Sequence, residues 1–436
     1  MQRKVTDEQI SEIKHLLATK RYGQKEIAKQ FNISRSLVSD IATKRIHSKV
    51  GEDYQGKKQG GQYKPLPLHD PTDSRILSLE AEVAHLKEER TYIKKQLGSA
   101  IKTYGLFNEL VDELQHSIQP LEALPNLFEF DASKEKIVEP AVLHLSDGHH
   151  DQVVTKEECG GLEEYNFPIS MRRAEILVGT ALKWTQQIMA PSYTFPSLTI
   201  LSYGDHTSGE IHNHTQRSYF RNIFKNCLAI GQLHALMIRD FAPYFHQVNV
   251  VCVPGNHGRR SIKKDYHGAH DNWDYLIAEI TQLHCRGLKN VNFLIPNSYS
   301  VKLDIAGVGF CIFHGDDIRS NLGIPWYGLQ KKQQKILALN SIQGGTRIRY
   351  NCCGHFHTPA SLGGMDGAMM INGPWVATDS YAYHSFGGFT EPTQLLHGVD
   401  SRYGVTWKLP IYLRTDNEAR GPQRYTIPDF DKVSII

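Results

Sequence analysis

The sequence predicts an α/β body that follows a small all-α domain and a helical segment with a coiled-coil pattern. Short apolar runs alternate with helical patterns from about residue 139, which is typical of α/β proteins. Residues 1–68 carry a net charge of +7, whereas the rest of the chain carries −4. Apolar residues also recur with a seven-residue period between residues 76 and 114, as in coiled coils.

Composition places the protein among ordinary globular chains, with 40% apolar and 22% charged residues in a length of 436. The first residues lack the apolar core of a signal peptide, and no stretch approaches about 18 consecutive apolar residues. We therefore expect neither a secreted precursor nor a membrane protein. Seven cysteines without framework spacing predict reduced, buried thiols in a cytoplasmic protein. Cys352 and Cys353 lack the second cysteine pair that a zinc site would need.

Residues 1–47 are predicted to form three helices. The first should run from Asp7 to Thr19, and apolar residues at helical spacing predict two more helices on either side of Asn32-Ile33-Ser34. Asparagine tolerates the left-handed conformation that ends a helix, and Ser34 can cap the next one. A plain three-helix cap is one interpretation, but the positive charge favours a polyanion partner.

This pattern resembles the helix-turn-helix of resolvases and phage regulators. The resemblance implies that the second helix of the motif enters the major groove of DNA. It also implies two sets of contacts with DNA. Base edges or phosphates would be contacted by Ser34, Arg35, Ser36 and Ser39, and the DNA backbone by Lys44 and Arg45.

Two connecting segments follow. Residues 48–73 are rich in Gly, Lys, Gln, Pro and Asp, which predicts a flexible linker. Residues 74–118 have large apolar side chains at ten of twelve heptad seam positions, which predicts a coiled coil or a helical hairpin and a homodimer. Arg90 lies on the seam and can fix its register. Gly98 and Gly105 weaken the later half, which could instead fold back on the body.

Five apolar strands are expected in residues 135–414, and each ends in polar residues. The strands are Ala141–Leu145, Ser197–Tyr203, Val248–Val253, Val308–Phe313 and Ile348–Cys353. Ligands bind at the carboxyl ends of strands in open α/β sheets. Five such ends in order predict a metal site built from the residues that follow the strands: Asp147 and His149, Asp205, Asn256 and His257, His314, then His355 and His357.

The ordered series D-x-H, G-D, G-N-H, H and G-H-x-H resembles the calcineurin-like metallophosphoesterases over residues 139–410. It looks like a phage-type branch related to double-strand-break repair nucleases. The resemblance implies two packed β-sheets with helices outside, and His257 as general acid or phosphate clamp. It further implies two metal ions, the first on Asp147, His149 and His357, the second on Asn256, His314 and His355, and Asp205 bridging them.

The donor types suit this chemistry. Two divalent ions roughly 3.5–4 Å apart can clamp a phosphate and activate water. Mixed carboxylate, amide and imidazole donors favour manganese, with iron or zinc as alternatives. The sequence departs from many relatives after G-N-H, where Arg259 and Arg260 follow Gly258 instead of an acid. His257 thereby lacks one orienting partner, and the basic run could grip DNA or be a solvated loop.

The sequence therefore predicts a two-metal phosphodiesterase, foremost a DNA nuclease targeted by its amino-terminal domain. One alternative is a phosphodiesterase or phosphatase that acts on cyclic nucleotides or other small phosphoesters. Another is a DNA-binding regulator with an idle metal site. Residues 415–436 are expected to form an irregular tail without functional signal.

Overall fold

The chain divides into two compact units, Met1–His85 and Leu86–Ile436, which we describe separately. The predicted linker of residues 48–73 lies outside the described residues, as do six of the twelve heptad seam positions. The computed structural model describes six residues in the range 83–94 and residues 6–19, 23–42, 105, 107–129, 136–211, 218–261, 268–318, 325–364, 366–414 and 423–427.

The first unit contains the three expected helices, α1 (Asp7–Thr19), α2 (Gln24–Gln30) and α3 (Arg35–Ala42). Asn32 takes the expected left-handed conformation between α2 and α3, with φ 50°. Ser34 Oγ accepts a hydrogen bond of 3.2 Å from the N–H of Leu37 and so caps α3. The small core consists of buried aliphatic side chains: Ile10, Ile13, Ile27, Ala28, Val38 and Ile41.

The first sheet of the second unit has six strands in the order β13-β12-β2-β4-β5-β6. Strands β2, β4, β5 and β6 run parallel, and β12 is antiparallel to both β2 and β13. All residues of β2 are buried, and four of its five side chains are apolar, with His144 as the exception. The bounds are β2 (Ala141–Leu145), β4 (Ser197–Ser202), β5 (Gln247–Cys252), β6 (Val291–Leu294), β12 (Thr393–Asp400) and β13 (Gly404–Tyr412).

The second sheet has five strands in the order β10-β11-β9-β8-β7. Strands β8, β9 and β11 are parallel, with β7 and β10 antiparallel at the edges. The five strands expected from the sequence are present, with bounds that differ by at most one residue. The bounds are β7 (Ser300–Ile305), β8 (Val308–Phe313), β9 (Ile348–Cys353), β10 (Ala360–Gly363) and β11 (Ala368–Ile371).

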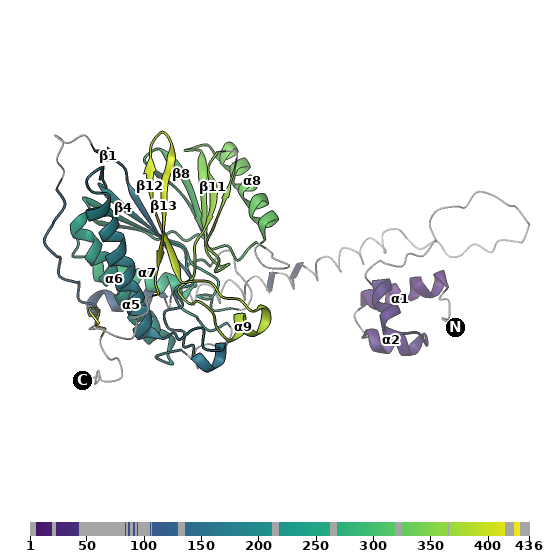
Figure 1. Cartoon of the computed structure of the whole chain (residues 1–436). Helices are drawn as coiled ribbons and strands as arrows, with labels where there is room; N and C mark the ends of the chain where they lie inside the picture. The colour runs from purple at the N-terminus through teal and green to yellow at the C-terminus, as the bar shows by residue number, and fades with distance from the viewer. Residues whose placement is uncertain are drawn as a thin grey trace, which may run out of the picture. The chain divides into compact units, whose positions relative to one another are not determined.

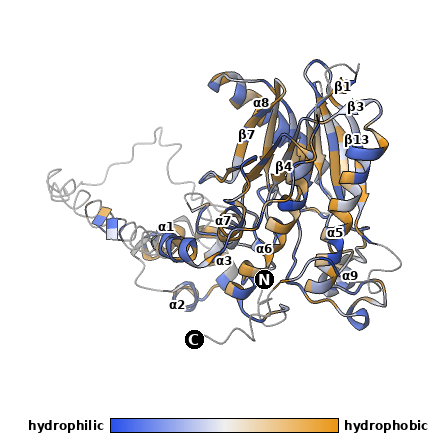
Figure 2. Ribbon diagram, turned by 90° about the vertical axis from the view of Figure 1, so that its left-hand side faces the viewer, coloured by the Kyte–Doolittle hydropathy of each residue, from blue (hydrophilic) through white to orange (hydrophobic). Residues whose placement is uncertain are grey.

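The two sheets pack face to face, as expected, with helices outside (Figure 1). Val142, Leu201 and Val251 of the first sheet meet Phe310 and Cys352 of the second in one buried cluster. Figure 2 shows hydrophobic residues concentrated along the strands and α6. The outer face of the first sheet is covered by α5 (Phe167–Lys183), α6 (Ile223–Phe241) and α7 (Trp273–Cys285), and that of the second by α8 (Trp326–Gln343).

Short elements complete the second unit. Strands β1 (Ile137–Val138) and β3 (Tyr193–Thr194) pair in parallel. The strands of this unit lie between Ile137 and Tyr412. The remaining helical turns are η1 (Lys156–Cys159), the π-helical η2 (Trp184–Ile188), η4 (Ala242–Tyr244) and α9 (Ser380–Phe386).

The later half of the heptad segment packs on the body. Residues 107–117 are helical, and the seam residues Phe107 and Val111 are buried in the large core beneath α5, α6 and α7. The Phe107 ring meets Trp273 edge-on, with ring centroids 5.4 Å apart. Among the earlier seam positions, Val83 and Leu86 are 47% and 55% exposed.

Residues 423–427 of the expected tail are irregular but anchored. The phenol of Tyr425 is buried and donates a 2.9 Å hydrogen bond to Asp240 Oδ2 on α6. The N–H groups of Arg424 and Tyr425 both donate to Glu175 Oε1 on α5, at 2.7 Å. This short segment therefore ties α5 to α6.

All seven cysteines are free and buried, as expected. Cys352 lies between the two sheets, whereas Cys353 lies on the opposite face of β9, beneath α8. The two thiols therefore point away from each other and do not share a metal. Among the described residues, no helix has the length and apolar character needed to span a membrane.

Candidate metal centre

The seven predicted ligands lie in the loops that follow five strands. Neighbouring parallel strands end at a common edge, so their loops converge there. Residues after β2, β4 and β5 come from the six-stranded sheet, and those after β8 and β9 come from the five-stranded sheet. In this order they are Asp147 and His149, Asp205, Asn256, His314, and His355 and His357.

Their donor atoms converge in three overlapping sets, in each of which the atoms lie within 4.8 Å of one another. Asp205 belongs to the second and third of these sets and His149 to the first and third, so the third set joins the other two. Asn256 Oδ1 lies 2.9 Å from His314 Nε2 and so joins the second set. Both sets that match the expected metal positions combine residues from the two sheets. The sets are Asp147–His149–His357, Asp205–His314–His355 and His149–Asp205–His257.

Five of these residues adopt left-handed backbone conformations that are uncommon outside glycine. Their φ angles lie between 39° and 67°. Such conformations cost on the order of 1–3 kcal/mol each and cluster at functional sites. The five are Asp147, His149, Asp205, His355 and His357, and the other non-glycine residues of this kind in the described chain are Asn32, Arg221 and Ala306.

Two glycines make room for the carboxylates. A Cβ on Gly354 would lie 2.0 Å from Asp147 Oδ2, and one on Gly255 would lie 2.2 Å from Asp205 Oδ1. Real Cβ atoms do not approach other atoms so closely. The glycines of the G-N-H and G-H-x-H motifs are therefore required by the close approach of each loop to a carboxylate.

Asp205 and His314 form a buried pair at the centre of the site. His314 Nε2 lies 2.9 Å from Asp205 Oδ2, and its Nδ1 donates to the carbonyl of Tyr203 at 2.9 Å. Burial alone would raise the pKa of Asp205, but the imidazoles of His314 and His257 hold it well below its ordinary value. The hydrogen bond at Nδ1 fixes the ring so that Nε2 faces the site.

Asp147 links the loops after β2 and β9. Its Oδ1 accepts a 2.8 Å hydrogen bond from the N–H of His355 and lies 3.5 Å from His357 Nε2. Ser146 Oγ donates to the other carboxylate oxygen. Burial and the neighbouring His314 lower the pKa of His355 to about 4.

His257, the predicted general acid, lies beside the site with its ring 4.7 Å from that of His149. Its N–H donates to Asp205 Oδ1 at 2.8 Å. The orienting partner that the sequence seemed to lack is a backbone group, because Nδ1 donates to the carbonyl of Ser208 at 3.1 Å. Ser208 is in turn held by Asp151 Oδ1, which accepts its N–H at 2.7 Å.

Asp274 supports the site and was missed by the sequence analysis. Its carboxylate is buried at the start of α7 and accepts the backbone N–H groups of Asp205, His206 and Gly255, at 3.0, 3.0 and 2.9 Å. Asn272 caps α7 and donates to the carbonyl of Gly255 at 3.0 Å. The only local signal was Asn272 ahead of an apolar helix, which predicts a helix start but no contact with distant loops.

Arg259 and Arg260 make intramolecular contacts. Arg259 Nε donates to the carbonyl of Asn256 at 3.0 Å. The Arg260 guanidinium lies over the rings of Phe107 and Trp273, at 5.7 and 5.9 Å, and pairs with Asp271. Arg260 is nevertheless exposed, so a solvated loop and a contact with DNA both stay open as interpretations.

The predicted DNA-contacting residues of the first unit are placed in part. Ser34 caps α3, Arg35 is exposed on α3, and Ser39 is half-buried. Ser36 lies on α3, but its side chain is not described. Lys44 and Arg45 lie outside the described residues. The structure therefore gathers the seven metal candidates with His257, but leaves the DNA-contacting set open.

The donor set fits divalent cations. It contains two carboxylates, one amide oxygen and four imidazoles, a mixture that suits manganese, iron or zinc better than magnesium or calcium.

No family model matches the sequence, and no curated protein matches it either. Solved structures with a remote likeness include a predicted phosphoesterase from Streptococcus pneumoniae TIGR4, with 9% identity, a TM-score of 0.26, and coverage of 62% of this chain and 98% of the other. An archaeal phosphodiesterase has 12% identity, a TM-score of 0.28, and coverage of 62% and 99%. A hypothetical protein from Pyrococcus horikoshii OT3 has 12% identity and a TM-score of 0.31, with coverage of 63% of this chain and 88% of the other. Such values transfer no activity, so the function is inferred from this chain's own residues.

Proposed function

We propose that this protein is a dinuclear metal-dependent phosphodiesterase and that its substrate is DNA. The observation that carries the proposal is the convergence of two donor sets, Asp147–His149–His357 and Asp205–His314–His355, which are joined by a third set, His149–Asp205–His257. Two bound divalent ions would neutralise phosphate charge and lower the pKa of water at the site. Manganese is the first expectation, with iron and zinc as alternatives.

Particular residues would hold the two ions, and His257 would act on the substrate. The first ion would be held by Asp147, His149 and His357, the second by Asn256, His314 and His355, and Asp205 would lie between them. His257 donates through Nδ1 to Ser208, so its Nε2 can protonate the leaving oxygen or bind the phosphate. The two short hydrogen bonds of His257 fix its position relative to Asp205.

Support for DNA comes from the first unit. Residues 1–68 have a net charge of +7, and the turn between α2 and α3 has the expected left-handed Asn32. Arg35 is exposed on α3. By the helix-turn-helix resemblance, α3 would enter the major groove and bring the enzyme to its substrate.

We further propose a cytoplasmic homodimer that forms through the earlier heptad positions. Val83 and Leu86 are exposed seam residues, whereas Phe107 and Val111 are occupied by the body. The dimer seam would therefore lie before Gly98. Sedimentation of the full chain at micromolar concentration should give twice the monomer mass, and a monomer alone would contradict the proposal.

The decisive test is cleavage of labelled linear, circular and single-stranded DNA with added manganese, run beside a chromogenic phosphodiester. Wild type should cut DNA, and the Asp205→Asn and His257→Ala variants should lose most of that activity. Asp304→Asn is the control, because the Asp304 carboxylate accepts hydrogen bonds from the Gly307 N–H and the Thr346 hydroxyl, and neither residue belongs to the metal centre.

The outcomes of this test distinguish the proposed function from its two alternatives. If only the small ester is hydrolysed, the metal chemistry stands and DNA is wrong as the substrate. If neither is hydrolysed by metal-loaded protein that still binds DNA, the chain is a DNA-binding regulator with an idle site.

A further inference from the structure

Three buried histidines, His150, His206 and His234, form a cluster that the proposed reaction does not use. We propose that this cluster binds one late first-row divalent cation, with zinc as the best match, separately from the dinuclear centre. The proposal rests on the cluster itself and goes beyond the phosphodiesterase function.

The three imidazoles converge from separate elements. His150 lies in the loop after β2, His206 in the loop after β4, and His234 on α6. Their side chains are at most 5% exposed, and the ligand atoms that they can offer lie within 4.8 Å of one another. The ring of His206 is 4.6 Å from that of His234, and the rings of His150 and His234 are 5.1 Å apart.

Hydroxyl groups orient two of the rings. His150 Nδ1 lies 2.6 Å from Ser170 Oγ, which leaves Nε2 at 3.1 Å from His234 Nε2. His206 Nε2 lies 2.7 Å from Ser202 Oγ. A hydrogen bond at one ring nitrogen is the usual way in which proteins direct the other nitrogen to a metal.

His206 Nδ1 is the atom that most needs a ligand. It is buried and has no hydrogen-bond partner. A buried polar nitrogen without a partner costs about 1–3 kcal/mol, and such atoms are rare in folded proteins. A metal ion at the cluster would take this nitrogen as a donor.

Charge favours a cation here. Negative charge is close, because Asp205 directly precedes His206, and Asp274 Oδ1 accepts the N–H of His206 at 3.0 Å. An all-imidazole set favours zinc, cobalt, nickel or copper over manganese, magnesium or calcium.

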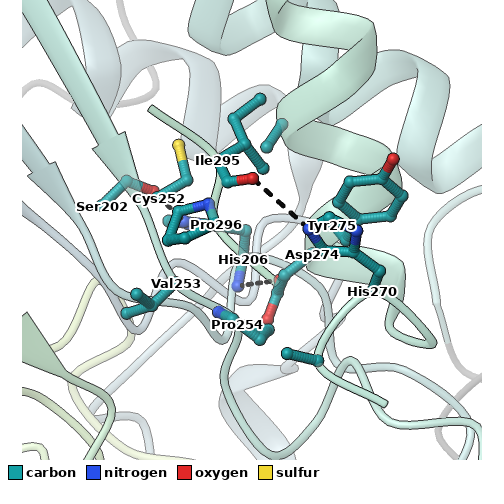
Figure 3. Close-up of a pocket in the computed structure, with 12 residues that line it drawn as sticks. Ser202, His206, Cys252, Val253, Pro254, His270, Asp274, Tyr275, Ile295 and Pro296 are labelled. Atoms are coloured by element: carbon teal, nitrogen blue, oxygen red, sulfur yellow. Dashed lines mark hydrogen bonds between the residues drawn. The ribbon is translucent and has the colours of Figure 1, made fainter. Parts of the chain in front are cut away.

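A small cavity reaches the cluster between the first sheet and α6 and α7. His206 and His234 line it with Ser202 and Cys252, and the cavity volume is about 20 Å³. This is room for one water, which could complete a tetrahedral site. Figure 3 shows His206 beside Ser202 and Asp274 at the adjoining hollow.

The first experiment is metal counting on metal-free wild-type protein. With saturating manganese we expect two equivalents per chain, and with zinc or cobalt we expect three. Crystals grown with zinc should show an anomalous peak between the three rings. Two equivalents with every metal, and no peak at the cluster, would overturn the proposal.

The second experiment removes one ligand. His234→Gln should lower zinc binding from three equivalents to two and leave manganese-dependent hydrolysis within about twofold of wild type. His397→Gln is the matched control, because His397 is equally buried and its Nε2 also lies 3.1 Å from a histidine Nε2, that of His144, without a third imidazole. It should keep three equivalents.

Three zinc ions retained by folded His234→Gln would contradict the assignment. If that variant does not fold, the wild-type crystal decides. Neither the zinc count nor the anomalous peak depends on phosphodiester hydrolysis, so failure of the proposed function would leave these two measurements valid.

Discussion

Asp274 holds the backbone of Asp205 by accepting its N–H at 3.0 Å. Asp205 has a left-handed φ of 55°, and the hydrogen bond helps to maintain that conformation at a residue that belongs to two of the three donor sets. The start of α7 thus fixes the loop that follows β4, although the two are far apart in the sequence.

Asp274→Asn should therefore weaken the site without touching a metal. The amide keeps one acceptor and would leave at least one buried N–H of Asp205, His206 or Gly255 unsatisfied, at about 1–3 kcal/mol. We expect manganese affinity to fall about 10–100-fold, as measured by calorimetry. An affinity equal to that of Asp304→Asn would show that Asp274 does not position the site.

Gly354→Ala should displace Asp147. The new Cβ would lie 2.0 Å from Asp147 Oδ2, so the carboxylate or the β9 loop must move. We expect loss of most metal-dependent activity and a lower melting temperature. Gly363→Ala is the control, because nothing lies within 4 Å of its Cβ. Equal activity of the two variants would contradict this account.

Stability should fall in acid partly because of two buried histidines away from the metal centre. Burial lowers the pKa of His144 well below its ordinary value and that of His397 to about 3. The unfolded chain binds protons below about pH 6.5 that the folded chain does not, so stability falls as the pH drops from there toward 3.

Each such histidine contributes up to about 1.4 kcal/mol per pH unit. His397→Gln should therefore show a shallower loss of unfolding free energy between pH 6 and 5, measured with urea on metal-free protein. An unchanged slope would mean that His397 is protonated in the folded state.

Tyr425→Phe should loosen the carboxyl-terminal segment from α6. The phenol donates to the buried carboxylate of Asp240, and a hydrogen bond to a charged group contributes about 1.5–3 kcal/mol. We expect a comparable loss of unfolding free energy. Tyr412→Phe, at a side chain that is 59% exposed, should have little effect, and equal losses would refute the anchoring role.

The sequence predicted the strands of the sandwich closely, because buried parallel strands are continuous apolar runs. It also predicted which residues follow them, since strand ends share an edge of a sheet. The conformations of those residues were not predictable: no local pattern indicates that Asp147 or His357 takes a positive φ.

Contacts between distant segments were missed for the same reason. The carbonyl of Ser208 and the carboxylate of Asp274 approach the site only after folding, and neither belongs to a motif. The heptad pattern was ambiguous in a physical sense, because Phe107 and Val111 can fill a coiled-coil seam or the core of the body equally well.

Both donor sets combine loops of the six-stranded sheet with loops of the five-stranded sheet. Cations held there would cross-link the two sheets, so that neither sheet could unfold locally while the other stayed folded. Amide hydrogens of β8 and β9 should then exchange with solvent at the rate of global unfolding when metal is bound, and faster, through partial opening, when it is removed.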